Sequence, residues 1–177
     1  ANITITVTGV NDAPVAVNDT DSVNEDATVT KTGAQDDLLN DDSDADDSAS
    51  LSITNISHSN GNTGSVASSS TYASNGTQIV GTYGTLTVGA DGSYTYTADQ
   101  DAADSIADGS SETDVFTYTL SDGSATDTAT ITITVSGADN EVAGVNDTGA
   151  VDDDSTLSVG NQSACVLSND TDNGSAA

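Results

Sequence analysis

The side chains best suited to chemistry are aspartates that crowd one short stretch, DDSDADD at residues 41–47. Asp42, Asp44 and Asp46 alternate along it, so a loop could direct their carboxylates to one side. Carboxylate oxygens in such a pattern suit calcium, a hard cation that takes about six to eight oxygen ligands. The stretch lacks the glycine and the bidentate glutamate of an EF-hand loop. It therefore predicts a calcium-binding loop of another kind, with a solvated acidic loop as the alternative.

Asn/Asp and Glu/Asp pairs form a second set of possible ligands near the start of the chain. Side chains of this type also cap their own backbone in turns, so ordinary turn chemistry is the alternative. Asp122, in a Ser-Asp-Gly turn, is open to both interpretations. The full set of candidate metal ligands is Asn11, Asp12, Asn18, Asp19, Glu25, Asp26, Asp41, Asp42, Asp44, Asp46 and Asp122, with Asp147, Asp154, Asp170 and Asp172 further along the chain.

Nucleophilic and general-base catalysis find little support in the sequence. His58 is the only histidine, and no second histidine or reactive cysteine is present to complete a catalytic group with it. Paired carboxylates could serve glycoside hydrolysis, but no aromatic sugar platform accompanies them. Cys165 is the only cysteine and is interpreted as a small buried apolar residue. We expect a protein that is not an enzyme.

The charge balance restricts the partners. The chain has 177 residues, with 29 Asp and Glu against one Lys or Arg, and a formal net charge of −28. A nucleic-acid partner is excluded because there is no basic surface to meet phosphates. No apolar run approaches the length of about 18 residues that a membrane span needs, so no membrane insertion is expected. The acids are almost all aspartate, which favours turns and oxygen-ligand loops over helices.

An internal repeat organises the chain. ITITVTGVNDAPVAVNDT starts at Ile3, and ITITVSGADNEVAGVNDT starts at Ile131, 128 residues later. The same offset aligns LLNDDSD with VLSNDTD, so Asp42 and Asp44 correspond to Asp170 and Asp172. We predict that residues 1–10 are the closing strand of a preceding repeat, that 11–138 form one complete repeat, and that 139–177 open the next. The chain begins with alanine and not methionine, which we interpret as a segment of a longer protein.

The complete repeat has the pattern of β-structure. Apolar and polar residues alternate in LSITNIS, in GTLTV with GSYTYTA, and in DVFTYTL with ATITITV. Asp-Gly turns separate the last two pairs of strands. The segment 57–77 is expected to be a long loop or ragged hairpin, and 99–112 a loop with a short helical turn. Several short strands with one proline predict an all-β sandwich or barrel.

The strings GTYGTLTV, ADGSYTYT, TDVFTYT and ATITITV, together with NDAPVAVND and LLNDDSDADD, resemble the VCBS-type, cadherin-like tandem repeats of bacterial RTX adhesins and giant surface proteins. The resemblance implies an immunoglobulin-like Greek-key β-sandwich and calcium at or near the junctions between domains. It also implies that the ligand pairs from Asn11 to Asp26 share ions with the preceding domain. The second copy departs from the pattern, since it reads DNEVAG where the first has NDAP.

These features favour a calcium-stabilised extender of an adhesin outside the bacterial cell, whose partners are neighbouring repeats of the same chain. Two alternatives remain open. One is a subunit of a self-assembling extracellular filament, with other copies of the chain as partners. The other is a domain that binds an adhesion ligand directly, although exposed aromatic side chains, which usually mark such a site, are scarce.

Overall fold

The computed structural model describes residues 1–33, 36–46, 49–138, 142–143, 171–172 and 175–176. The chain divides into two compact units, Ala1–Ala138 and Asp139–Ala177. In the second unit the described strands are β10 (Val142–Ala143), β11 (Thr171–Asp172) and β12 (Ser175–Ala176), which form a small antiparallel sheet. Among the described residues no segment forms a helix long and apolar enough to cross a membrane.

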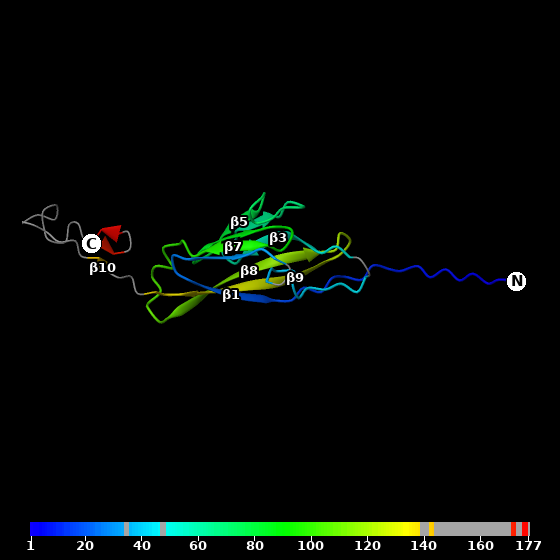
Figure 1. Ribbon diagram of the computed structural model, residues 1–177, viewed down its shortest axis with the longest axis horizontal. Helices are drawn as coiled ribbons and strands as arrows, with labels where there is room; N and C mark the ends of the chain where they lie inside the picture. The colour runs from blue at the N-terminus through cyan, green and yellow to red at the C-terminus, as the bar shows by residue number, and fades with distance from the viewer. Residues whose placement is uncertain (34–35, 47–48, 139–141, 144–170, 173–174, 177) are drawn as a thin grey trace, which may run out of the picture. The chain divides into compact units, whose positions relative to one another are not determined.

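The first unit is a sandwich of two sheets (Figure 1). One sheet has the order β1 (Asp19–Asn24), β9 (Thr126–Ser136), β8 (Ser111–Ser121), β3 (Ser52–His58) and β4 (Thr63–Ser65). The other has the order β2 (Thr28–Lys31), β7 (Tyr94–Thr97), β6 (Thr85–Val88) and β5 (Thr77–Val80). The chain crosses between the sheets from β1 to β2, from β2 to β3, from β4 to β5 and from β7 to β8. This confirms the all-β, immunoglobulin-like fold.

Alternation of residue types explains why these strands pack face to face. In β9, Ile131, Ile133 and Val135 are fully buried, while the threonines between them are half exposed. β8 contributes Phe116, Tyr118 and Leu120 in the same way, which is the two-residue period of a strand with one face in a core. The buried apolar core also includes Ile53, Ile56, Ile79, Leu86, Val88, Tyr94 and Tyr96.

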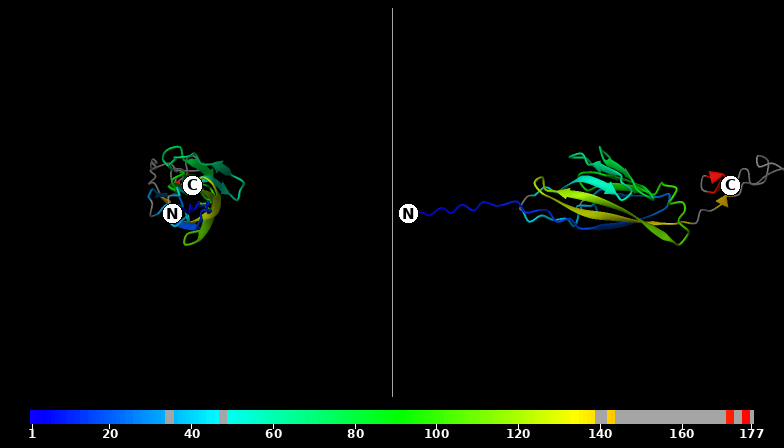
Figure 2. Two further views of the ribbon diagram at one scale, coloured as in Figure 1. Left: turned by 90° about the vertical axis from the view of Figure 1, so that its right-hand side faces the viewer. Right: turned by 180° about the vertical axis from the view of Figure 1, so that it is seen from behind.

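The direction of β1 decides where the chain enters and leaves the sandwich. β1 pairs in parallel with β9, with Asp19 opposite Ile131 and Asn24 opposite Ser136. The first and last strands of the unit therefore run the same way, so the chain comes in at one end and leaves at the other (Figures 1 and 2). We call these the upstream end, made of residues 11–17, 37–46 and 121–126, and the downstream end, made of residues 24–27, 98–110 and 136–138.

Two segments expected to be loops contain ordered turns and strands. Residues 99–110 form tight turns and no regular helix, in which Ala103 N–H donates to Gln100 O at 2.7 Å and Ile106 N–H to Ala103 O at 2.9 Å, and residues 111–112 already belong to β8. Part of 57–77 is regular, since β3 and β4 form a hairpin through a turn at residues 59–62.

Residues 1–10 form no strand and leave apolar side chains in solvent. Ile3, Ile5 and Val7 are 89%, 81% and 88% exposed. The residues that correspond to them in the repeat are Ile131, Ile133 and Val135 of β9, all fully buried. The prediction that 1–10 closes a preceding repeat would account for this exposed pattern.

Candidate metal-binding ends of the sandwich

At the upstream end, the aspartate loop lies against the incoming chain. Asp12 N–H donates to Asp46 Oδ2 at 2.8 Å, and Val17 N–H donates to Asp42 Oδ1 at 2.8 Å. Between these bonds, the backbones of Val15 and Ser43 pair as a short antiparallel bridge. The aspartate loop and the Asn/Asp pairs of the second predicted set therefore meet at one end, because a non-local backbone pairing joins them.

The β8–β9 turn adds two more carboxylates there. Asn11 Nδ2 donates to Asp122 Oδ2 at 2.9 Å, and Ala16 N–H donates to Asp127 Oδ2 at 3.0 Å. The backbone N–H of Ala125, with Asn11 and Ser124, lowers the pKa of Asp122 below its ordinary value. Backbone N–H donors of Ala16 and Thr128 likewise lower the pKa of Asp127. Both carboxylates are thus held in the charged form.

Further inside, carboxylates crowd around the Tyr118 hydroxyl. This hydroxyl lies 2.8 Å from Val17 O, 3.1 Å from Asp19 Oδ2 and 3.4 Å from Asp42 Oδ1. Burial raises the pKa of Asp19 from 3.8 to about 7, and the negative charges of nearby aspartates add to the rise while Tyr118 opposes it. Burial also raises the pKa of Asp42 and of Asp37. A cation at this position would relieve the repulsion.

The aspartate loop does not converge on a point as the alternating spacing suggested. Asp44 Oδ1 accepts the N–H of Asp46 at 2.7 Å, while the carboxylates of Asp42 and Asp46 turn to the incoming chain. No three acidic, histidine or cysteine side chains of the described part of the chain stand in metal-binding geometry. Asp44 Oδ2 is nevertheless buried with no hydrogen-bond partner from the described residues.

The downstream end has its own carboxylate. Glu25 is only 4% exposed, and its Oε1 accepts the N–H of Ala138 at 3.0 Å. Its second oxygen, Oε2, is buried and has no hydrogen-bond partner in the part of the chain that the structure describes. An ionised carboxylate normally has each oxygen hydrogen-bonded or bound to a cation when it is buried. Asp26 follows in the turn from β1 to β2, in the left-handed backbone conformation with φ of 59°.

The position of Glu25 and Asp26 corrects the sequence-based grouping. They were expected to act with Asn11, Asp12, Asn18 and Asp19 at the junction with the preceding domain. β1 carries them to the opposite end, next to residues 136–138. Six strand residues span roughly 20 Å, so nearness in the sequence is misleading here.

The remaining predicted ligands have mixed placements. Asn18 Oδ1 accepts hydrogen bonds from the N–H and Oγ1 of Thr130, which fastens the incoming chain to β9. Asp41 is exposed beside Asp42. Asp147, Asp154 and Asp170 lie outside the described residues, as does Cys165, and only the backbone of Asp172 is described, in β11.

The chain has a single Lys or Arg, and it lies at neither end. Lys31 Nζ is 3.8 Å from Asp21 Oδ2, which also accepts the Tyr94 hydroxyl at 2.8 Å. Within the described residues, no Lys or Arg side chain therefore neutralises the carboxylates of the two ends.

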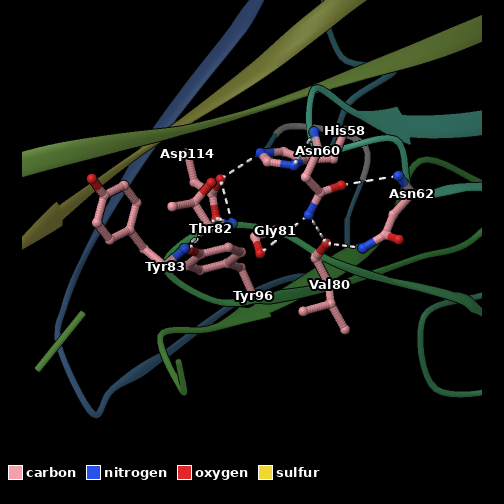
Figure 3. A network of polar contacts seen from close by, with 9 residues as sticks. All are labelled: His58, Asn60, Asn62, Val80, Gly81, Thr82, Tyr83, Tyr96 and Asp114. Carbon is pink, nitrogen blue, oxygen red and sulfur yellow. Dashed lines mark hydrogen bonds and ion pairs between the residues drawn. The ribbon is translucent and has the colours of Figure 1, made fainter. Parts of the chain in front are cut away.

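Sequence reasoning missed a buried polar network centred on Asp114 (Figure 3). Asp114 is 1% exposed, and its Oδ1 is 2.8 Å from Nε2 of His58. Its Oδ2 accepts the Tyr96 hydroxyl at 2.9 Å and the Tyr83 N–H at 3.1 Å, and the Thr82 N–H donates at 3.1 Å. The network joins β3 and β8 of one sheet to β7 and the β5–β6 turn of the other.

His58 has no free ring nitrogen for catalysis in this network. Nε2 faces Asp114, and Nδ1 accepts the N–H of Asn60 at 3.2 Å. The ring also packs against Phe116, with ring centroids 4.9 Å apart. The arrangement suits a neutral imidazole that holds two strands together.

In the calcium-free chain, we expect the melting temperature to fall as the pH rises from about 4 to about 7. Asp19 has a pKa of about 7 in the folded chain and an ordinary value of 3.8, so between these values the folded state holds more protons than the unfolded state. Raising the pH through this window therefore favours unfolding. Thermal melts in metal-free buffer would measure the fall, and Asp19→Asn should make it shallower. An unchanged pH dependence in Asp19→Asn would mean that general repulsion, and not Asp19, is responsible.

Comparison with known proteins gives one family. The family model for the bacterial cadherin-like domain matches residues 11–137, which is nearly the whole of the first sandwich from its upstream to its downstream end. No curated protein matches the chain.

Proposed function

The chain belongs to the family of bacterial cadherin-like domains, and from this membership we propose that it is a calcium-stabilised extender of a large bacterial surface or secreted adhesin. The module holds a distal binding region away from the cell and is not an enzyme. The observation that carries the proposal is that each end of the sandwich has a buried carboxylate oxygen with no partner among the described residues, Asp44 Oδ2 upstream and Glu25 Oε2 downstream.

The parallel pairing of β1 with β9 supports an end-to-end array. A module whose chain enters and leaves at opposite ends adds length with every copy, whereas one with adjacent termini would fold the array back. Asp139 corresponds in the repeat to Asn11, the first residue of the sandwich, and it directly follows Ala138, the last. Successive sandwiches therefore need no added linker.

The donor sets fit calcium, which prefers carboxylate and carbonyl oxygens. Upstream, Asp44 would hold the ion with Asp12, Asp42 and Asp46, and Asn11 and Asp122 lie close by. Downstream, Glu25 and Asp26 would share an ion with the next repeat. When bound, calcium supplies positive charge where the described residues provide no Lys or Arg. The chain's own carboxylates then hold the two domains at a fixed angle, since ligands from both surround one ion.

One observation favours the filament alternative. The exposed Ile3, Ile5 and Val7 have the pattern of a buried strand, and such a strand could complete a sandwich in another copy of the chain. In a single array, the same segment would complete the preceding repeat of its own chain.

An array of three copies of residues 11–138, joined directly, tests the extender proposal. Small-angle scattering should show a longer maximum dimension and a narrower distance distribution after millimolar calcium is added. The ion replaces repulsion between the two faces of a junction with shared ligation. Glu25→Gln in every copy should abolish the lengthening while each sandwich stays folded.

Asp101→Asn in every copy is the matched control, because this exposed carboxylate lies on a downstream loop and is not among the proposed ligands. An array that is equally extended with and without calcium would contradict the extender mechanism and leave acidic repulsion as the better account.

A further inference from the structure

The downstream end has a cavity that the calcium proposal does not use. Its volume is about 480 Å³, within the range of about 300–1,000 Å³ that is usual for small-molecule sites. The turns of residues 98–110 form one side. Tyr83, which precedes β6, and the start of β8 form the other. The lining residues are Tyr83, Ala102, Ser105, Ile106, Ala107, Ser110 and Glu112.

The floor and one wall are apolar. Ala102, Ile106 and Ala107 offer methyl and methylene groups, and Ile106 is 8% exposed where it packs on the core. Tyr83 donates its backbone N–H to Asp114, while its ring points away from Asp114 (Figure 3) and lines the cavity. An aromatic face beside an aliphatic floor accepts an alkyl stem, and it also attracts a cation.

The charge at the rim is negative only. Glu112 is exposed, and no described residue donates a hydrogen bond or offers a positive charge to its carboxylate. The loop that forms the cavity adds Asp99, Asp101, Asp104 and Asp108 nearby. No lining residue is Lys, Arg or His. A ligand with a positive charge is therefore complementary to the rim.

The loop is clamped, so the cavity exists before any ligand arrives. Gly137 N–H donates to Ser110 O at 3.0 Å, and a side chain at Gly137 would collide with the carbonyl oxygens of Ile106 and Ala107. Further bonds within the turns, such as Ile106 N–H to Ala103 O at 2.9 Å, hold the floor. Pre-formed walls reduce the entropy cost of binding.

We propose that this cavity binds a primary ammonium group on an alkyl stem, in the form of a lysine side chain of a partner protein. The stem packs on Ala102, Ile106 and Ala107, and the ammonium lies between the Tyr83 ring and the Glu112 carboxylate. A bare metal ion fits less well, since an apolar floor supplies no oxygen ligands. A neutral sugar fits less well because the polar side chains of the lining are one carboxylate, two serines and one tyrosine, with no amide or guanidinium donor. The cavity lies at the same end as Glu25, but none of the proposed calcium ligands is among its lining residues.

Titration of the full chain with Nα-acetyl-lysine methylamide, followed by two-dimensional NMR in saturating calcium, tests the proposal. The shifts should concentrate on the Ile106 methyl groups and the Tyr83 ring. The norleucine analogue, which keeps the stem and lacks the nitrogen, should bind more weakly by about threefold or more. Glu112→Gln should weaken the lysine probe by a similar factor, whereas Asp108→Asn, which removes a charge from the same loop outside the cavity, should leave binding unchanged.

Three outcomes would overturn the proposal. Equal binding of the norleucine analogue would show that the cavity recognises apolar surface alone. Equal weakening by Asp108→Asn would reduce the effect to diffuse counter-ion attraction. So would the absence of shifts at Ile106 together with loss of binding in 0.3 M sodium chloride, where the screening length is about 6 Å.

Discussion

Calcium at 10 mM is expected to raise the melting temperature of the chain by about 10 °C relative to chelator-treated protein. Extracellular calcium modules bind with dissociation constants of about 10⁻⁴–10⁻³ M, so this concentration exceeds the constant by about ten- to a hundredfold. Binding to the folded state alone then contributes up to about 2.7 kcal/mol for each site. Differential scanning calorimetry with calcium and with EDTA would measure the shift.

The contribution of specific ligation can be separated from charge screening. Asp42→Asn with Asp44→Asn should remove the upstream share of the calcium-induced shift, and Glu25→Gln the downstream share. Asp101→Asn should keep the whole shift, since this exposed side chain lies outside both donor sets. Sodium chloride at matched ionic strength should not reproduce the calcium effect. If it does, the charge of −28 is simply screened by counter-ions and no site needs to exist.

The strands could be predicted from the sequence because their pattern is local. Alternating residues such as Ile131, Ile133 and Val135 indicate which face of β9 lies in the core. This indication does not depend on which strands β9 pairs with. The Asp-Gly turns likewise predict, from local sequence alone, the hairpins between β6 and β7 and between β8 and β9. Only the strand order and the parallel pairing of β1 with β9 depend on distant segments.

The candidate site was harder to predict for the same reason. That Asp42 and Asp46 lie against the incoming chain follows from backbone pairing between Val15 and Ser43, which no local pattern records. Glu25 is only six residues from Asp19 in the sequence, but an extended strand separates the two. Two ligands that are close in the sequence therefore lie at opposite ends of the sandwich when a strand runs between them.

The burial of Asp114 could have been predicted from the sequence. It occupies the inward-facing series Asp114, Phe116, Tyr118 and Leu120 of β8, where an acidic residue must find donors when it is buried. The donors themselves come from three other segments, with His58 in β3, Tyr96 in β7 and the backbone of the β5–β6 turn. The alternation could have identified the buried carboxylate, whereas its partners needed the tertiary structure.

Asp114→Ala is expected to lower the free energy of unfolding by about 3–5 kcal/mol. The change removes the acceptor of His58 Nε2, of the Tyr96 hydroxyl and of the Thr82 and Tyr83 N–H groups, and leaves these donors buried without a partner. A side chain at Gly81 would collide with the Asp114 carboxylate, so a glycine stands beside it. Urea unfolding in saturating calcium should show a lower midpoint with an unchanged slope.

Two variants distinguish a central acceptor from a simple ion pair. His58→Ala should cost less than Asp114→Ala, because it leaves Asp114 with the Tyr96 hydroxyl and two backbone donors. Asp127→Ala, which removes a carboxylate near the surface that accepts two backbone N–H bonds, should lower the free energy of unfolding far less than Asp114→Ala. If His58→Ala and Asp114→Ala cost the same, and the double variant costs no more than either, the His58–Asp114 pair acts alone and the backbone donors contribute nothing. If Asp114→Ala costs less than about 1 kcal/mol, the two sheets are held by apolar packing, and the buried carboxylate does not join them.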